Sequence, residues 1–335
     1  MLREEGTAGG YRPFKNDKQS NTVTPSSASL PTVAILLCTM QGHEYLREQL
    51  DSILHQTHSN WITWASDDGS DDGTHSILAE YQGQLGKSRL SISQGPADGY
   101  VANFLSLVCN PDITADYYAY ADQDDIWEKD KLAWALAWLQ TIPDEIPALY
   151  CGRTRNVDAN NRYLGLSTLF ARPPGFSNAL VQNIGGGNTM VFNNAARDLL
   201  CLAGPEIPVV AHDWWTYLLV SGCGGIVFYD ARPTVRYRQH NANLVGTNAS
   251  WSARLRRAWL LLHGRFRNWN SINIAALQSI RSQLTPENQC TLDQFSKARN
   301  SGLFARLEGL AESGIYRQTR LGNLGLVAAA ILKKI

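Results

Sequence analysis

The chain has 335 residues, of which 44% are hydrophobic and 18% charged, a composition ordinary for a globular protein and far from disordered or collagen-like chains. Its 30 Lys and Arg balance its 30 Asp and Glu, so the formal net charge is zero and nothing in it points to nucleic acid as a partner. The length favours one large α/β domain with a C-terminal appendage over several small domains.

The cysteines and the apolar runs bear on the compartment. The six cysteines are scattered singly without C-x-x-C pairs, which favours free thiols in a reducing compartment over disulfides or a zinc site. The N-terminal segment carries Glu4 and Glu5 and lacks the apolar stretch of a signal peptide. No apolar run reaches the roughly 18 residues that a membrane span needs. The sequence therefore predicts a cytoplasmic protein whose membrane contact, if any, is peripheral.

The first half of the chain alternates between two kinds of segment. Residues 1–31 are rich in Gly, Ser, Thr and Asn and are predicted to form a flexible tail. From Thr32 on, short apolar runs typical of buried strands alternate with segments of helical periodicity. Strands are predicted at 33–38, 61–66, 89–93 and 116–121, and helices at 43–55, 74–84, 100–109 and 128–140. This βαβ succession implies a largely parallel sheet with helices on both faces.

The second half is less regular and ends in a basic helical region. Strands are predicted at 148–152, 188–192, 224–229 and 234–240, and helices at 194–203 and 212–220. We therefore predict an α/β domain over 32–247 and a helical C-terminal extension over 248–335. The extension mixes arginines with aromatic residues from Trp251 on, which fits an anionic membrane surface; a solvated helical pair packed on the domain is the alternative.

Two acidic clusters follow predicted strands. Asp67 and Asp68 follow the second strand, and Asp122, Asp124 and Asp125 follow the fourth. In a parallel sheet, ligands bind at the carboxyl ends of the strands. Carboxylates gathered there repel one another, and a hard divalent cation that also binds phosphate oxygens relieves the repulsion. The alternative for each cluster is a turn that caps the following helix.

A series of motifs then indicates a family. In order along residues 32–247 the chain carries TMQGHEYLREQLDSILHQT, SDDGSDDGT, GYVANF, ADQDDIWEKDKL, GGGNTMVFN, HDWW and YRQHNANLVG. Each motif is weak alone, but the ordered series resembles the inverting glycosyltransferases of family 2. The resemblance implies their GT-A fold, a Rossmann-like and mostly parallel sheet flanked by helices. The forms DQDDIW and YRQHNANLVG are most similar to bacterial rhamnosyltransferases and other transferases of O-antigen and capsule synthesis.

The resemblance also implies residue roles on the donor side. Thr39 and Asp67 or Asp68 would hold the base and ribose of the nucleotide, and Asp122 would face the ribose or the sugar. Asp124, in the family's D-x-D motif, would bind Mg²⁺ or Mn²⁺ that bridges the diphosphate.

Further implied roles come from the second half of the domain. His240 would give another contact to the metal or the diphosphate, and Asp213 would be the general base. Gly186, Gly187 and Asn188 would form a loop between donor and acceptor. The chemistry agrees with these roles, because a hard cation neutralises a leaving diphosphate and a carboxylate can deprotonate the attacking hydroxyl. The alternatives are a helix N-cap for Asp213, a surface position for His240 and a plain turn for the glycines.

The function implied by the resemblance is transfer of L-rhamnose from a dTDP donor to a hydroxyl of a cell-surface glycan precursor, a glycan growing on a lipid carrier. Transfer from another donor, such as a UDP-hexose, is the alternative. A nucleotidylyltransferase is a rival reading, but it normally has a Gly-rich, basic loop after the first strand, where this chain has TMQGHEY. A non-catalytic carbohydrate-binding or scaffold protein is the rival from another class, and Asp124 and Asp213 argue against it.

Overall fold

The computed structural model describes residues 30–240 and 264–335, and the described residues from Pro31 on belong to one compact unit. The predicted tail lies almost wholly outside the described residues. So does the start of the predicted extension, including Trp251, Arg254, Arg256 and Arg257. The boundary proposed near residue 247 also falls there and stays a prediction.

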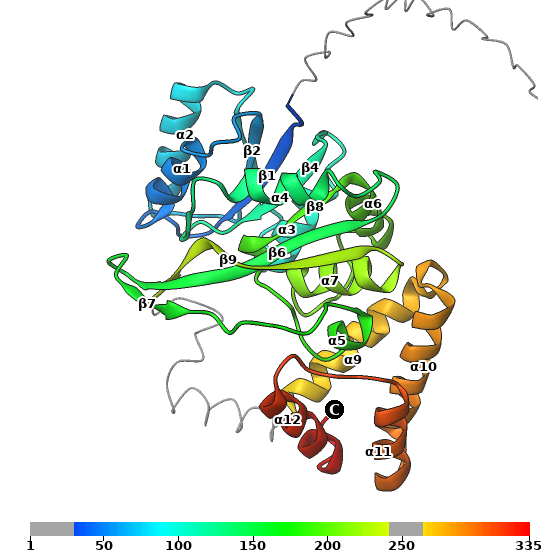
Figure 1. The fold of residues 1–335 in the computed structure, drawn as a ribbon. Coiled ribbons are helices and arrows are strands. Elements are labelled where there is room, and N and C mark those ends of the chain that lie inside the picture. Colours follow the sequence, from blue (N-terminus) through cyan, green and yellow to red (C-terminus); the bar gives the residue numbers. More distant parts are fainter. Residues whose placement is uncertain (1–29, 241–263) are drawn as a thin grey trace, which may run out of the picture. The chain divides into compact units, whose positions relative to one another are not determined.

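A nine-stranded sheet lies at the centre of the described chain (Figure 1), in the order β3-β2-β1-β4-β8-β6-β9-β5 with β7 paired to β6. Strands β1 to β4 are mutually parallel, as predicted. β8 runs antiparallel to β4 and β6, whereas β6 and β9 are parallel, so the whole sheet is mixed. The strands are β1 (Val33–Thr39), β2 (Trp61–Asp67), β3 (Leu90–Gln94), β4 (Tyr117–Ala121), β5 (Ile126–Trp127), β6 (Ala148–Asp158), β7 (Tyr163–Leu166), β8 (Val191–Asn193) and β9 (Ile226–Gln239).

Helices flank the sheet and make up the C-terminal region (Figure 1). The described helices are α1 (Leu46–Leu54), α2 (Thr74–Leu85), α3 (Gly99–Val108), α4 (Lys131–Leu139), α5 (Phe176–Ala179), α6 (Asn194–Ala203), α7 (His212–Gly222), α9 (Arg265–Ser279), α10 (Pro286–Asn300), α11 (Leu303–Glu312) and α12 (Arg320–Ile331), with short 3-10 turns η1 (Gly187–Thr189) and η2 (Arg281–Gln283). No helix in the described ranges is long and apolar enough to cross a membrane.

Two hydrophobic cores form because side chains alternate along buried strands. In β1, Ala34 and Leu36 face the core that α3, α6 and α7 cover, whereas Ile35 and Leu37 face the core under α1, α2 and α4. The C-terminal helices add side chains such as Leu277 to the first of these cores. The sheet is thus buried on both faces.

The structure departs from the sequence-based expectations at a few elements. The segments expected as strands at 224–229 and 234–240 belong to one continuous strand, β9. The two-residue strand β5 and the edge strand β7 were not foreseen. β5 is defined only by its antiparallel pairing with β9, about a hundred residues later, so local periodicity gives no signal for it.

Candidate active site

The ends of β1 and β2 are joined by a buried carboxylate. Thr39 and Asp67 stand opposite each other in the parallel register, and the Thr39 hydroxyl donates to Asp67 Oδ2 over 2.6 Å. The Ser70 amide and hydroxyl also donate to Asp67, each over 2.7 Å, and His75 Nε2 lies 3.1 Å away. Burial alone would raise the pKa of Asp67, but the hydrogen bonds from Thr39 and Ser70 hold it below its ordinary value. Asp67 is therefore a charged anchor for the loop that follows β2.

Asp68 performs a similar task one residue later. Its carboxylate accepts hydrogen bonds from the amides of Ala97 and Gly99, at 2.7 and 3.0 Å, and so ties the end of β2 to the start of α3. A Cβ built at Gly95 would lie 2.6 Å from Asp68 Oδ1, so the backbone passes close to this carboxylate. Both acids thus shape the loops at this edge of the sheet, and their contact with a nucleotide stays a prediction.

The D-x-D loop after β4 is fixed to the loop after β1. Gln123, between the two acids of the motif, exchanges two 2.8 Å hydrogen bonds with the backbone of Met40. Asp122, the first acid of the motif, is partly buried. Burial, together with repulsion from Asp124 and Asp213, raises its pKa to about 8. The acids predicted from the ADQDD and HDWW motifs therefore lie close enough to interact.

Asp124 lies close to His240, the residue that directly follows β9. His240 Nε2 lies 2.7 Å from Asp124 Oδ2, and both side chains remain partly exposed. The arrangement brings together the two residues predicted to contact the metal.

The next acid in the motif, Asp125, has a different position. It is fully buried, where it accepts hydrogen bonds from Asn188 Nδ2 and from the amide of Arg238, at 3.2 Å. Burial and then repulsion from Asp124 and Asp122 raise its pKa well above the ordinary value. Asn188, predicted to lie between donor and acceptor, therefore links the glycine loop to the D-x-D loop.

Asp213 opens α7 and faces the same loop. Its Oδ2 accepts from the amide of Gly187 over 3.0 Å and its Oδ1 from the amide of Trp214 over 2.6 Å. Burial raises the pKa of Asp213 to about 6, although these hydrogen bonds lower it in part. A carboxylate held in place by backbone donors, with a pKa near neutrality, has the properties of a general base.

The neighbouring His212 has a different environment. Its ring stacks on Phe104 with centroids 3.9 Å apart and meets Tyr120 edge-on at 4.8 Å. Burial lowers the pKa of His212 to about 3, so the ring is neutral in any working buffer. A Cβ at Gly187 would lie 2.5 Å from His212 Nε2, which explains the glycine at this position.

Two side chains near the acids, Tyr100 and Lys131, gave no clear signal in the sequence. Tyr100, in the first turn of α3, is 40% exposed, and Asp213 and Asp122 add to burial in raising its pKa. Lys131 is fully buried with its amine 3.3 Å from the centroid of the Trp127 ring. A tyrosine in a helical segment and a lysine in an apolar run carry no local sequence signal, and only the fold shows that they lie near the acids.

The buried side chain of Arg238 supports the D-x-D loop. It is 1% exposed, its Nε donates to the backbone oxygen of Asp124 at 3.0 Å, and its Nη2 pairs with Glu48 at 2.9 Å. This guanidinium therefore fixes the main chain beside the predicted metal ligand.

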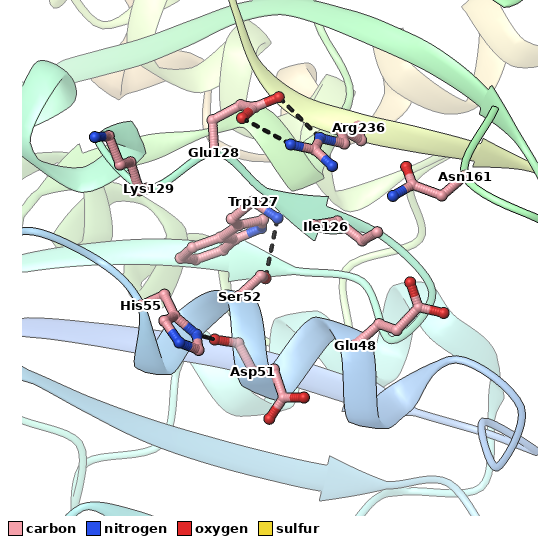
Figure 2. Close-up of a pocket in the computed structure, with 10 residues that line it drawn as sticks. All are labelled: Glu48, Asp51, Ser52, His55, Ile126, Trp127, Glu128, Lys129, Asn161 and Arg236. Atoms are coloured by element: carbon pink, nitrogen blue, oxygen red, sulfur yellow. Dashed lines mark hydrogen bonds and ion pairs between the residues drawn. The ribbon is translucent and has the colours of Figure 1, made fainter. Parts of the chain in front are cut away.

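A pocket of about 430 Å³ lies between α1 and β5 and contains none of the predicted site residues (Figure 2). Glu48 lies at its rim, the Trp127 amide donates to Ser52, and Glu128 pairs with Arg236 over 3.0 Å. The predicted acids converge at the strand ends and not in this pocket, so we take the strand ends as the candidate active site.

The residues at the strand ends suit a divalent cation that also takes oxygen ligands from the phosphates of a bound substrate. Among the described residues, no group of three or more His, Cys, Asp or Glu could hold a metal ion by itself. Mg²⁺ is commonly bound by one or two carboxylates while substrate phosphates supply further oxygens. The partly exposed pair of Asp124 and His240, beside further carboxyl groups, fits that donor set.

Comparisons with known proteins agree with the fold and the motifs. The family model described as glycosyl transferase family 2 matches residues 34–198. The chain is 31% identical over 244 residues to a dTDP-rhamnosyl transferase, RfbG, of Shigella flexneri, which covers 69% of this chain and 81% of that protein. An uncharacterized glycosyltransferase of Rickettsia typhi is 22% identical over 247 residues, or 68% and 72% of the two chains.

Among solved structures, TarS 1-349 of S. aureus in complex with UDP-GlcNAc covers 84% of this chain and 89% of its own, with a TM-score of 0.50 and 15% identity. That likeness supports the fold alone, and it confirms the predicted GT-A architecture. The fold and the matches define a glycosyltransferase enzyme. The chain belongs to glycosyltransferase family 2.

Proposed function

We propose that this glycosyltransferase moves L-rhamnose from dTDP-rhamnose to a hydroxyl of a cell-surface glycan precursor, with inversion, on the cytoplasmic side of the membrane. The donor is proposed because the relative from Shigella flexneri is described as a dTDP-rhamnosyl transferase. The acceptor is proposed to be a glycan, free or carried on a lipid. A UDP-hexose donor is the alternative that the experiment below distinguishes.

Asp213 carries the mechanistic proposal. Its carboxylate is held by the amides of Gly187 and Trp214, so it cannot turn away from the acidic cluster. With a pKa of about 6 it is ionised at neutral pH and still basic enough to take a proton from an attacking hydroxyl. The other candidates serve less well. His212 has a pKa of about 3 and is a weak base. Asp125 is fully buried and its pKa is raised well above the ordinary value by burial, whereas Asp213 is partly exposed.

The leaving group is proposed to lie at Asp124 and His240. These residues would hold Mg²⁺ or Mn²⁺, which neutralises the charge that develops on a departing diphosphate. Asp122 would face the ribose or sugar, and Thr39, Asp67 and Asp68 would form the nucleotide end of the site. The turn of Gly186, Gly187 and Asn188 would separate donor from acceptor, since its Gly187 amide reaches the proposed base.

A screen of nucleotide sugars tests the proposal. Calorimetry with dTDP-rhamnose, UDP-glucose, UDP-GlcNAc and GDP-mannose, each with and without Mg²⁺, should give metal-dependent binding that is tightest for dTDP-rhamnose. Tighter binding of a UDP sugar would move the proposal to a hexose donor. No binding of any nucleotide sugar would favour a scaffold that has kept the fold.

A further inference from the structure

The last helix presents an apolar face to solvent. Along α12, Leu321, Leu324, Val327 and Ile331 are exposed, with Leu321 79% and Leu324 67% accessible. At 3.6 residues per turn these positions fall on one side of the helix. The opposite side, with Leu326, Ala329 and Ala330, is buried.

This face belongs to a firmly anchored helix. The Thr319 hydroxyl caps α12 by accepting from the amide of Gly322 at 3.0 Å. Near the other end, Arg306 of α11 donates to the carbonyl of Ala330 over 2.8 Å. The preceding segment is held as well, because the Gln318 amide donates to Gln182 over 2.9 Å. The exposed leucines are therefore not a consequence of a frayed end, because the helix that carries them, α12, is held at both ends (Figure 1, dark red).

The charge around the face has one sign. From Ser313 to Ile335 the sequence contains no Asp or Glu and has four basic residues, Arg317, Arg320, Lys333 and Lys334. Arg320 opens α12 and Lys333 follows it, and both are exposed, so cations flank the apolar stripe at its two ends. The nearest acids in sequence, Glu308 and Glu312, belong to the preceding helix α11.

We infer that the exposed face of α12 docks on an anionic lipid surface. A helix of 12 residues is about 18 Å long and too short to span a bilayer, but it can lie in the interface with its apolar side among the acyl chains. Basic residues at its ends then meet lipid phosphates, each worth about a fivefold gain in partition. The apolar stripe could equally pack against a second copy of the chain. The positive charge at both ends of the helix would, however, repel the same positive charge on that copy.

The inference rests on the proposed function, in which the acceptor is carried on a lipid. It deepens that function because it names the surface of the enzyme that would contact the membrane. Docking through α12 would keep the enzyme where such acceptors are concentrated. The vesicle experiment itself needs no knowledge of donor or acceptor, so its failure and that of the proposed function are separable.

Sedimentation of the full chain with vesicles tests the inference. The protein should pellet with vesicles of phosphatidylcholine and phosphatidylglycerol in equal amounts and stay in solution with phosphatidylcholine alone. The double variant L324D/I331D should lower the bound fraction at least about tenfold, and R320Q/K333Q should lower it about 25-fold. L202D is the matched control, since Leu202 on α6 is 59% exposed and outside α12, and it should bind like the wild type.

Three results would overturn the inference. These are wild-type protein that stays in solution with the anionic vesicles, L324D/I331D that binds them as well as the wild type does, and L324D/I331D that only dissociates a dimer in analytical ultracentrifugation. Thermal melts and nucleotide-sugar binding of each variant should match the wild type. A variant that melts early is replaced by L324Q/I331Q, for which the same loss of binding is expected.

Discussion

The Nε2 atom of His240 lies 2.7 Å from Oδ2 of Asp124, so the end of β9 meets the D-x-D loop across 116 residues of sequence. Both side chains are partly exposed, on an edge where further carboxylates gather. This pair is the one that the proposed cation and diphosphate would occupy, and it gives the first prediction.

Asp124→Asn should reduce sugar transfer on the order of 10²-fold or more, because the amide cannot counter the charge of a diphosphate through a cation. EDTA should abolish transfer by the wild type, and added Mg²⁺ or Mn²⁺ should restore it. Asp112→Asn, at an exposed position in the loop before β4, is the control and should leave the rate unchanged. Wild-type turnover in chelator would show that Asp124 has another task.

Asp213→Asn should bind donor and metal normally but transfer sugar 10²–10⁴-fold more slowly, about the range for loss of a general base. The asparagine keeps an oxygen for the Gly187 amide, so the loop should hold its shape. Rates with saturating donor, together with donor affinity by calorimetry, separate chemistry from binding. The N-cap of α7 is Ala211 and not Asp213, so a rate near that of the wild type would leave Asp213 with only a structural role in the first turn of α7, and the base would have to be sought elsewhere.

The pKa of Asp213 also predicts how the transfer rate and the stability depend on pH. The pKa of Asp213 is raised from 3.8 to about 6, so the transfer rate should rise with pH through about 6 as the base ionises. For stability the sign is opposite. The raised pKa stabilises the folded protein at pH values below 3.8, and this contribution is lost as the pH rises through about 6. Asp213→Asn should therefore melt at or above the wild-type temperature at pH 7.5 and lose the advantage at pH 5, and a lower melting temperature at pH 7.5 would contradict this sign.

Asp67→Ala and Asp68→Ala should both weaken binding of dTDP and its sugars while the protein stays folded. Asp67→Ala should also cost about 1–3 kcal/mol of stability, because the buried hydroxyl of Thr39 loses its acceptor. Thr39→Val is the companion variant, since it removes the same hydrogen bond and leaves the carboxylate. Calorimetry and thermal melts give the two quantities. Unchanged affinity in both Ala variants would mean that the pair only shapes its loops.

Gly187→Ala should destabilise the protein by about 1–3 kcal/mol, because the new methyl would overlap His212 Nε2 and press on the Asp213 side chain. Transfer should fall as the base moves from its place. Gly83→Ala is the matched control, since nothing lies within 4 Å of its added Cβ in α2 and alanine favours a helix by up to about 1 kcal/mol. Equal melting temperatures for the two variants would count against the close packing of Gly187 and His212.

The sequence by itself determined the parallel half of the sheet and the residues to suspect. Buried strands such as β1 and β4 are apolar runs bounded by turn residues, and this pattern is local. The resemblance to family 2 rests on the order of the motifs, and this order can be read from the sequence alone.

Only the tertiary structure decided how those residues meet. The pairing of β5 with β9, the contact of Asp124 with His240 and the hydrogen bond between Gly187 and Asp213 each join segments far apart in sequence. It also decided which acids are buried. Asp125 lies under Asn188 whereas Asp124 stays open to a ligand, although the two are adjacent in the chain. Burial and proximity set pKa values and ligand access, and both arise from packing between distant elements, which no local pattern encodes.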